Sequence, residues 1–186
     1  PAEQFRIIIG FTNGPCNYGP SRKLTGQPKE VFAIMNYAVD DNERPIFYKK
    51  VVETVVHEFC HSFTKIKGDT EKALEKSGKA LQEYTYFSMR RQAYSTWRNI
   101  LEESLVRAAT ICYLIDHDYD EKDIRNAIIE QVDRNFFWMP ELVQTLRYYE
   151  SHRKKYPTFT SFYPEIIRFF DRYVADVEKE IQKALK

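Results

Sequence analysis

Two histidines one helical turn apart, with a glutamate directly after the first, are the residues of this chain that point most clearly to chemistry. They are His57, Glu58 and His61 in the stretch "VVETVVHEFCHSF", residues 51–63. In an α-helix each residue advances by about 100°, so the two histidines lie about 40° apart on one face and can bind the same metal ion. Glu58 projects to the flank of that face, where it can reach a water on the metal. Two zinc ligands with a general base form the H-E-x-x-H motif, which predicts a catalytic zinc site.

A catalytic zinc site needs a third protein ligand. The extended form of the motif, H-E-x-x-H-x-x-G-x-x-H, is excluded because Thr64 occupies the glycine position and Lys67 the last histidine position. A later apolar segment, "NILEESLVRAATICYL", offers Glu102 and Glu103 instead. Neighbouring residues differ by about 100° around a helix, so only one of these two glutamates can face the metal. Helix geometry alone does not decide whether Glu102 or Glu103 is the third ligand.

The sequence pattern around these residues predicts an α+β fold that is mostly helical, with a small N-terminal sheet. Strands are expected over 5–11 and 29–39, which are apolar and β-branched, with a Gly/Pro/Asn-rich loop between them. The stretch from Ile46 to Met139 contains no proline, which favours successive helices. We expect helices over 46–66, 70–90, 93–116, 121–134 and about 140–155, and a last one from Pro164; Pro45 suits the first turn of the first helix.

The bulk composition fits one globular domain over residues 1–186. The chain is 43% hydrophobic, and its 28 basic and 27 acidic residues give a net charge of +1, so neither nucleic acid nor an anionic membrane is expected as a partner. No apolar run approaches the roughly 20 residues of a membrane span. Three cysteines do not describe a disulfide framework. The chain begins at Pro1 without a leader sequence and could be a piece of a longer precursor.

The motif and its surroundings resemble known families. "HEFCH" followed by a helical "EES" resembles the gluzincin metallopeptidases, whose third ligand is a glutamate on a later helix. More narrowly, "VVHEFCHSF", "EESLVRA" and "LRYYESHRKKYPTFTSFYP" look like a bacterial family of unknown function, described as gluzincin-like metallopeptidases. This resemblance implies a zincin-like fold, one Zn²⁺ per chain and a secreted or cell-envelope (periplasmic) protein. It also favours Glu103 as the ligand, because the small residue Ser104 follows it.

The resemblance further implies a Tyr or His in the C-terminal part that stabilises the oxyanion. Tyr149 and Tyr156 are favoured among the candidates, which also include Tyr148 and His152. Arg107 lies one turn beyond Glu103 and could hold either Glu103 or another carboxylate beside the metal site; an ordinary surface arginine is the alternative. In zincins the strand before the motif helix commonly pairs with substrate, which would make residues 29–39 a site of β-addition; a strand at the sheet edge that serves only the fold is the alternative.

These observations predict a zinc metallopeptidase, a hydrolase that cleaves peptide or protein substrates. His57, His61 and Glu103 would bind the metal, and Glu58 would act as general base. Two rivals remain open. The first is a zincin-fold binding module that contains metal but turns over no peptide. The second is a metal-free helical interaction domain, in which the two histidines lie on an ordinary core helix.

Overall fold

The computed structural model describes residues 4–10, 14, 16–36, 38–46 and 48–186 of the chain. Its contacts divide the chain into two compact units, Pro1–Lys65 and Ile66–Lys186, which we call the first and the second unit. The predicted class is confirmed, because the described residues form a small sheet in the first unit and helices over most of the remaining chain. The single domain expected over residues 1–186 stays a prediction.

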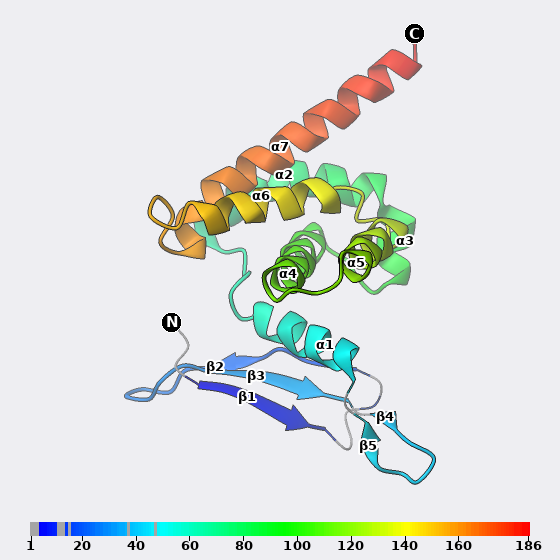
Figure 1. Ribbon diagram of the computed structural model, residues 1–186. Coiled ribbons are helices and arrows are strands. Elements are labelled where there is room, and N and C mark those ends of the chain that lie inside the picture. Colours follow the sequence, from blue (N-terminus) through cyan, green and yellow to red (C-terminus); the bar gives the residue numbers. More distant parts are fainter. Residues whose placement is uncertain (1–3, 11–13, 15, 37, 47) are drawn as a thin grey trace. The chain divides into compact units, whose positions relative to one another are not determined.

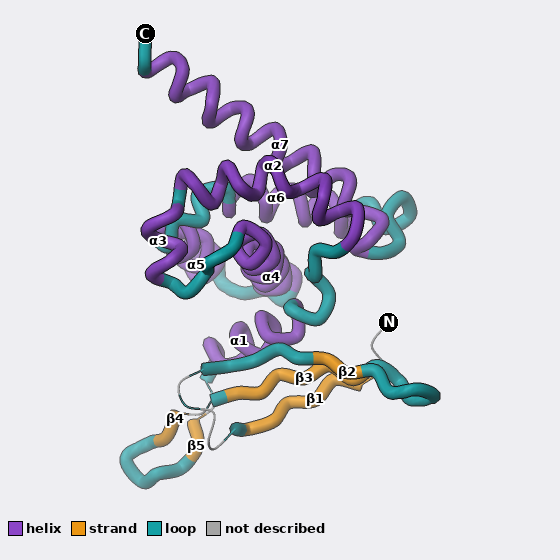
Figure 2. The backbone as a smooth tube through the Cα atoms, turned by 180° about the vertical axis from the view of Figure 1, so that it is seen from behind, coloured by secondary structure: helices purple, strands orange, loops and turns teal. Residues whose placement is uncertain are grey.

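The first unit contains a three-stranded sheet in the order β1-β3-β2 (Figure 1 and Figure 2). The strands are β1 (Gln4–Ile9), β2 (Ser21–Arg22) and β3 (Glu30–Met35). β1 runs parallel to β3, with Gln4 opposite Glu30 and Ile9 opposite Met35. β2 is antiparallel to β3, and a bridge between Tyr18 and Ile34 extends this pairing towards the N-terminus of β2. The sequence predicted β1 and β3 but missed β2, which lies in the Gly/Pro/Asn-rich stretch.

β3 lies in the centre of the sheet, and this corrects the expected role of residues 29–39. Its backbone is paired with β1 on one side and with β2 on the other. A strand paired on both sides has no free hydrogen-bonding edge, so β3 can neither accept a substrate strand nor serve as an edge strand. Both alternatives for this segment were wrong. Within this three-stranded sheet, the edges belong to β1 and to the segment of residues 18–22.

A two-stranded hairpin follows, made of β4 (Ala38–Val39) and β5 (Pro45–Ile46). The Asp40 side chain accepts hydrogen bonds from the backbone N–H groups of Asn42 and Arg44, each at 2.9 Å, and thereby closes the turn. Pro45 therefore lies in a short strand and not in the first turn of a helix, which corrects the prediction. A strand at the edge of a sheet accommodates a proline because one side of its backbone makes no ladder hydrogen bonds.

Helix α1 (Lys49–Cys60) carries the H-E-x-x-H motif and packs against β3 (Figure 1). The predicted helix over 46–66 is shorter at both ends. The end that carries the motif is fixed by side chains from the sheet: Phe5 meets Phe59 edge-on, with ring centroids 5.2 Å apart. Lys29 donates to the backbone oxygen of Ser62 at 3.1 Å, just beyond the last turn. A cation at this position also suits the negative end of the helix dipole.

Gly19 lies so close to α1 that it has no room for a side chain. A Cβ atom at Gly19 would lie 1.9 Å from the backbone oxygen of Glu58. The clashing oxygen belongs to the helix backbone, so no rotamer change can relieve the overlap. We expect Gly19→Ala to lower the free energy of unfolding of the first unit by at least about 3 kcal/mol, the upper range for overpacking. Urea denaturation followed by circular dichroism measures this effect.

Gly26→Ala is the matched control for that substitution. The added methyl group meets nothing within 4 Å, and the only penalty comes from the positive φ of +74° at Gly26. That backbone conformation costs about 1–2 kcal/mol for an alanine. Equal losses of stability in the two variants would contradict the close approach of Gly19 to α1.

The second unit consists of helices packed around α4 (Figure 1). α4 contacts α2, α5 and α6, and its buried residues occur on every side of the helix. A helix that is apolar all round belongs in the centre of a bundle. None of the helices that the structure describes is long and apolar enough to span a membrane. The helices are α2 (Gly68–Tyr84), α3 (Tyr86–Arg91), α4 (Trp97–Asp116), α5 (Glu121–Asp133), α6 (Met139–Ser151) and α7 (Phe159–Ala184).

Helix boundaries in the second unit also differ from the prediction. The helix expected over 70–90 is divided at Thr85 into α2 and α3. The last helix begins at Phe159, and Pro164 lies inside it. A capping box explains this early start, because the Thr158 hydroxyl accepts from the Ser161 backbone N–H at 3.1 Å and the Ser161 hydroxyl oxygen accepts from the Thr158 backbone N–H at 3.2 Å. These caps outweigh the tendency of the residue before a proline to avoid the helix.

Candidate metal centre

The two histidines of the motif lie one helical turn apart, as their spacing predicts: His57 is in the last turn of α1, and His61 is the residue directly after it. Their ring centroids are 5.0 Å apart, and the two ring planes meet at 82°. Both side chains are half-buried. Rings that are one helical turn apart and partly accessible can turn one nitrogen each towards a shared ion.

Glu58 is the buried residue of α1, with 6% of its surface exposed. It follows His57 directly, so its side chain leaves the helix about 100° from that of the histidine. The close approach of Gly19 to the Glu58 backbone oxygen holds this turn of the helix in place. The position suits a general base, because Glu58 flanks the helix face that carries the two histidines and can reach a water held there.

The acidic pair of the later helix lies on α4, and its two members have different partners. The helix begins after Thr96, whose hydroxyl accepts from the Asn99 backbone N–H at 3.2 Å. Glu102 accepts a hydrogen bond from the backbone N–H of Ile66 at 3.0 Å, so it anchors the start of the second unit. Glu103 is buried and forms an ion pair with Arg107 at 2.9 Å. Glu102 and Glu103 therefore have different partners, because neighbouring side chains leave a helix in directions about 100° apart.

Ser104 shows why a small residue follows Glu103. It is fully buried, and its hydroxyl accepts a hydrogen bond from the indole N–H of Trp138 at 2.9 Å. The same hydroxyl donates to the backbone oxygen of Ile100 at 2.7 Å. A larger side chain at this position would displace Trp138 from the core, so packing alone is enough to require a small residue here.

His57, His61 and Glu103 are the described residues whose donor atoms could hold a metal ion together. The two histidines belong to the first unit and the glutamate to the second, and each residue offers one ligand atom. Two imidazole nitrogens and one carboxylate oxygen match the donor set of catalytic zinc sites with two histidines and a glutamate. By the chemistry of its donors, the group fits zinc.

Arg107 holds Glu103 and its side chain is only 12% exposed, so the alternative of a surface arginine was wrong. Its Nη1 donates to the Gln131 side-chain oxygen at 2.5 Å, and its Nη2 donates to the Tyr94 hydroxyl at 3.0 Å. Burial, followed by the charge of Glu103, raises the pKa of Tyr94. Sequence reasoning found Arg107 by its helical spacing from Glu103, but it missed Tyr94 and Gln131, which are distant in the sequence.

The two favoured oxyanion donors lie in the aromatic core of the second unit. The Tyr149 ring meets Phe162 with ring centroids 5.0 Å apart, and burial raises the pKa of its hydroxyl. The Tyr156 hydroxyl donates to Glu165, and its ring meets Phe162 edge-on. His152 is exposed, and its Nδ1 lies 2.9 Å from the Tyr148 backbone oxygen. The assignment of Tyr149 and Tyr156 as oxyanion donors stays a prediction.

Tyr163 is a further tyrosine that the sequence did not single out. It is buried, and burial together with the charge of Glu102 raises the pKa of its hydroxyl. A tyrosine with a raised pKa keeps its proton at neutral pH and can donate a hydrogen bond. No sequence signal distinguishes Tyr163 from the other twelve of the thirteen tyrosines, because its relation to Glu102 depends on the packing of α7.

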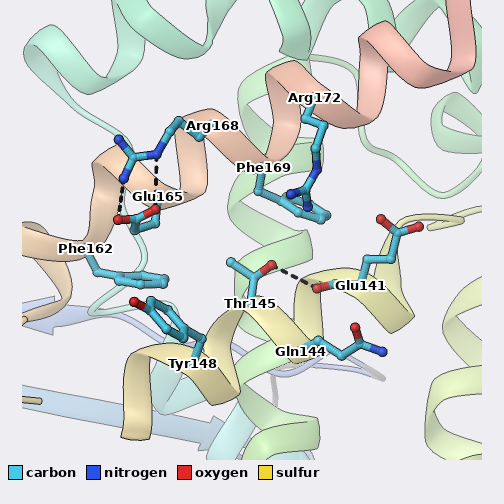
Figure 3. Close-up of a pocket in the computed structure, with 9 residues that line it drawn as sticks. All are labelled: Glu141, Gln144, Thr145, Tyr148, Phe162, Glu165, Arg168, Phe169 and Arg172. Carbon is cyan, nitrogen blue, oxygen red and sulfur yellow. Dashed lines mark hydrogen bonds and ion pairs between the residues drawn. The ribbon is translucent and has the colours of Figure 1, made fainter. Parts of the chain in front are cut away.

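A separate pocket of about 370 Å³ lies between α6 and α7 (Figure 3). Arg168 pairs with Glu165 on one wall, and Tyr148 lies beside Phe162. The pocket lining includes none of the residues His57, His61 and Glu103. It is therefore a feature of the α6–α7 surface and is not the metal group.

Comparison with known proteins places the chain in a family. No curated protein and no solved structure matches it. One family model matches residues 2–169, a range that includes α1 and α4. The description of that family names no activity, so the gluzincin and peptidase parts of the resemblance stay predictions. The chain belongs to the family described as Domain of unknown function (DUF4932).

Proposed function

We propose that this protein is a zinc-dependent peptidase with a zincin-like arrangement of its motif helix. His57, His61 and Glu103 would hold one Zn²⁺ per chain, and peptides or proteins would be the substrates. The donor set of two histidines one helical turn apart and one buried glutamate is the observation that carries the proposal. The motif and the resemblance select the same three residues.

When bound, zinc would supply a Lewis acid that activates a water and polarises the scissile carbonyl. The residues of the chain would then move the protons. Glu58 would take a proton from the attacking water and deliver it to the leaving amine, in the role of general base followed by general acid. A tyrosine hydroxyl would donate to the developing oxyanion.

A metal-containing binding module without turnover is the second candidate. It is favoured by the surroundings of Tyr156, whose hydroxyl already donates to Glu165 and whose ring lies in the aromatic core. A donor committed to another carboxylate would have to change partner before it could serve an oxyanion. The binding module needs no such change.

Peptide cleavage in a mixed library distinguishes the two candidates. The purified protein is loaded with zinc, incubated with a diverse peptide library, and the products are identified by mass spectrometry. The peptidase predicts new termini that disappear when a chelator removes the metal and return when zinc is added back. Bound zinc without any new terminus would support the binding module and contradict the peptidase.

Single hydroxyl deletions test the oxyanion donor. Tyr149→Phe and Tyr156→Phe each remove one hydroxyl and keep the ring in the core. The variant that loses the true donor is expected to show kcat lowered by about 10²–10³-fold. Tyr113→Phe on α4 is the control, since its ring stacks on His117 away from the aromatic core. Loss of activity in Tyr163→Phe alone would contradict both favoured residues and assign the role to Tyr163.

A further inference from the structure

A largely buried arginine and its partners surround the proposed ligand glutamate within the second unit. The side chains of Arg107 and Glu103 are only 12% and 8% exposed, and their ion pair is 2.9 Å long. Charged side chains are rarely buried unless they are paired, since taking them out of water costs several kcal/mol each. Arg107 provides the charge that makes a buried Glu103 carboxylate tolerable.

The guanidinium group is fixed from several directions. Gln131 on α5 accepts from Nη1, and Tyr94, which precedes α4, accepts from Nη2. The ring of Phe136 lies below the guanidinium carbon, with 5.0 Å between that carbon and the ring centroid. These partners come from three different parts of the chain, so the orientation of Arg107 is set by the packing of α4 against α5 and against the segment before α4.

One polar atom of Arg107 is left without a partner. In the part of the chain that the structure describes, its buried Nε has no hydrogen-bond acceptor. An unsatisfied buried donor costs about 1–3 kcal/mol. An arginine placed for stability alone would be expected to turn so that Nε is also satisfied. The orientation that is adopted instead directs Nη2 at both Glu103 and the Tyr94 hydroxyl.

From this arrangement we propose that Arg107 is a positioning residue that, with Tyr94 and Gln131, holds the Glu103 carboxylate in the orientation required to bind zinc. The proposal rests on the proposed function, because it concerns the same metal site. Arg107 contacts Oε1 of Glu103, and a carboxylate can bind a metal through its other oxygen while the first accepts a hydrogen bond. A ligand whose orientation is fixed before the metal arrives loses less conformational entropy on binding.

The planar shape of arginine is essential to this role. Two parallel N–H groups on one rigid plane can reach a carboxylate, a hydroxyl and an amide at once, whereas a lysine ammonium is a single point charge on a flexible stem. Arg107→Lys therefore keeps the charge beside Glu103 but loses the geometry. Loss of an outer partner of this kind typically weakens metal binding by about 10–100-fold.

The test measures zinc affinity and ligand geometry and does not depend on activity. Zinc dissociation constants are determined by competition with a chromophoric chelator for the wild type, Arg107→Lys and Tyr94→Phe. The visible spectrum of the cobalt-substituted protein reports the geometry of the ligands. We expect Arg107→Lys to bind zinc about 10–100-fold more weakly, with an altered cobalt spectrum. Tyr94→Phe removes only a hydroxyl and should shift both quantities in the same direction by less.

Arg134→Lys is the matched control. Arg134 pairs with Glu130 one helical turn away at 2.9 Å, which is the same spacing and distance as the pair of Arg107 with Glu103, but it is exposed. This variant should bind zinc as the wild type does and give an unchanged cobalt spectrum.

Three results distinguish a failure of the positioning role from a failure of the zinc site itself. Unchanged or tighter zinc binding in both Arg107→Lys and Tyr94→Phe, with only a lower Tm, would overturn the positioning role and leave the zinc site intact. A wild type that binds no zinc would overturn the proposed function and this inference together. Should Arg107→Lys fail to fold, Tyr94→Phe decides the question, because it leaves the ion pair in place.

Discussion

Glu58→Gln is expected to retain zinc and to cleave peptides at least about 100-fold more slowly than the wild type. The amide has nearly the same shape as the carboxylate but cannot take a proton from the attacking water. His57, His61 and Glu103 are unchanged, so the metal should remain. The measurement pairs zinc content with the initial rate on a peptide that the wild type cleaves.

Glu53→Gln is the control for this substitution. Glu53 lies on the same helix, more than one turn before the motif, and its replacement makes the same change of charge on α1. Its rate should match that of the wild type. If Glu58→Gln retained full activity with zinc bound, Glu58 would not be the general base and the mechanism would be wrong. Loss of zinc in Glu58→Gln would instead indicate that Glu58 acts as a ligand.

The second large effect is expected for His61→Ala. Removing one of three protein ligands should weaken zinc binding by more than the roughly 10–100-fold that follows from loss of an outer partner. The effect arises because water is a poorer donor than imidazole and brings no positioning from the helix. The zinc dissociation constant is measured by chelator competition, with circular dichroism to verify that α1 and the other helices persist.

His117→Ala serves as the comparison for His61→Ala. His117 is exposed, stacks on Tyr113 with ring centroids 3.7 Å apart, and receives no role in the metal group. Zinc affinity should be the same as in the wild type. Equal affinities in His61→Ala, His117→Ala and the wild type would mean that the two histidines of the motif are ordinary residues of a helix in the first unit.

The sequence alone predicted the elements that depend on local periodicity. The apolar spacing around His57 predicted a helix, and the mostly apolar stretch around Glu103 predicted α4, which is the central helix of its unit. Local patterns also indicated β1 and β3. The pattern could not show that β3 is central, because that depends on β2, a strand of two residues within a segment whose composition favours a loop.

Boundaries and partners were harder to predict because they depend on contacts distant in the sequence. Pro45 and Pro164 both suited a helix start, yet the Asp40 turn places one in a strand and the capping box at Thr158 places the other inside a helix. Helix geometry showed that only one of Glu102 and Glu103 can face the metal. It could not predict the hydrogen bond from the Ile66 backbone N–H to Glu102, which depends on tertiary packing. Tyr94 likewise reaches Arg107 only through tertiary packing.

Elemental analysis of the purified protein tests the zinc site most directly. Zinc is offered to the wild type, Glu103→Ala and Glu102→Ala, unbound metal is removed, and the zinc-to-protein ratio is measured. The proposed site predicts about one zinc per chain in the wild type and in Glu102→Ala, and a clear loss in Glu103→Ala. A wild type that holds no zinc after this treatment, with its helices intact, would contradict the metal centre and leave the H-E-x-x-H pattern as a chance feature of α1.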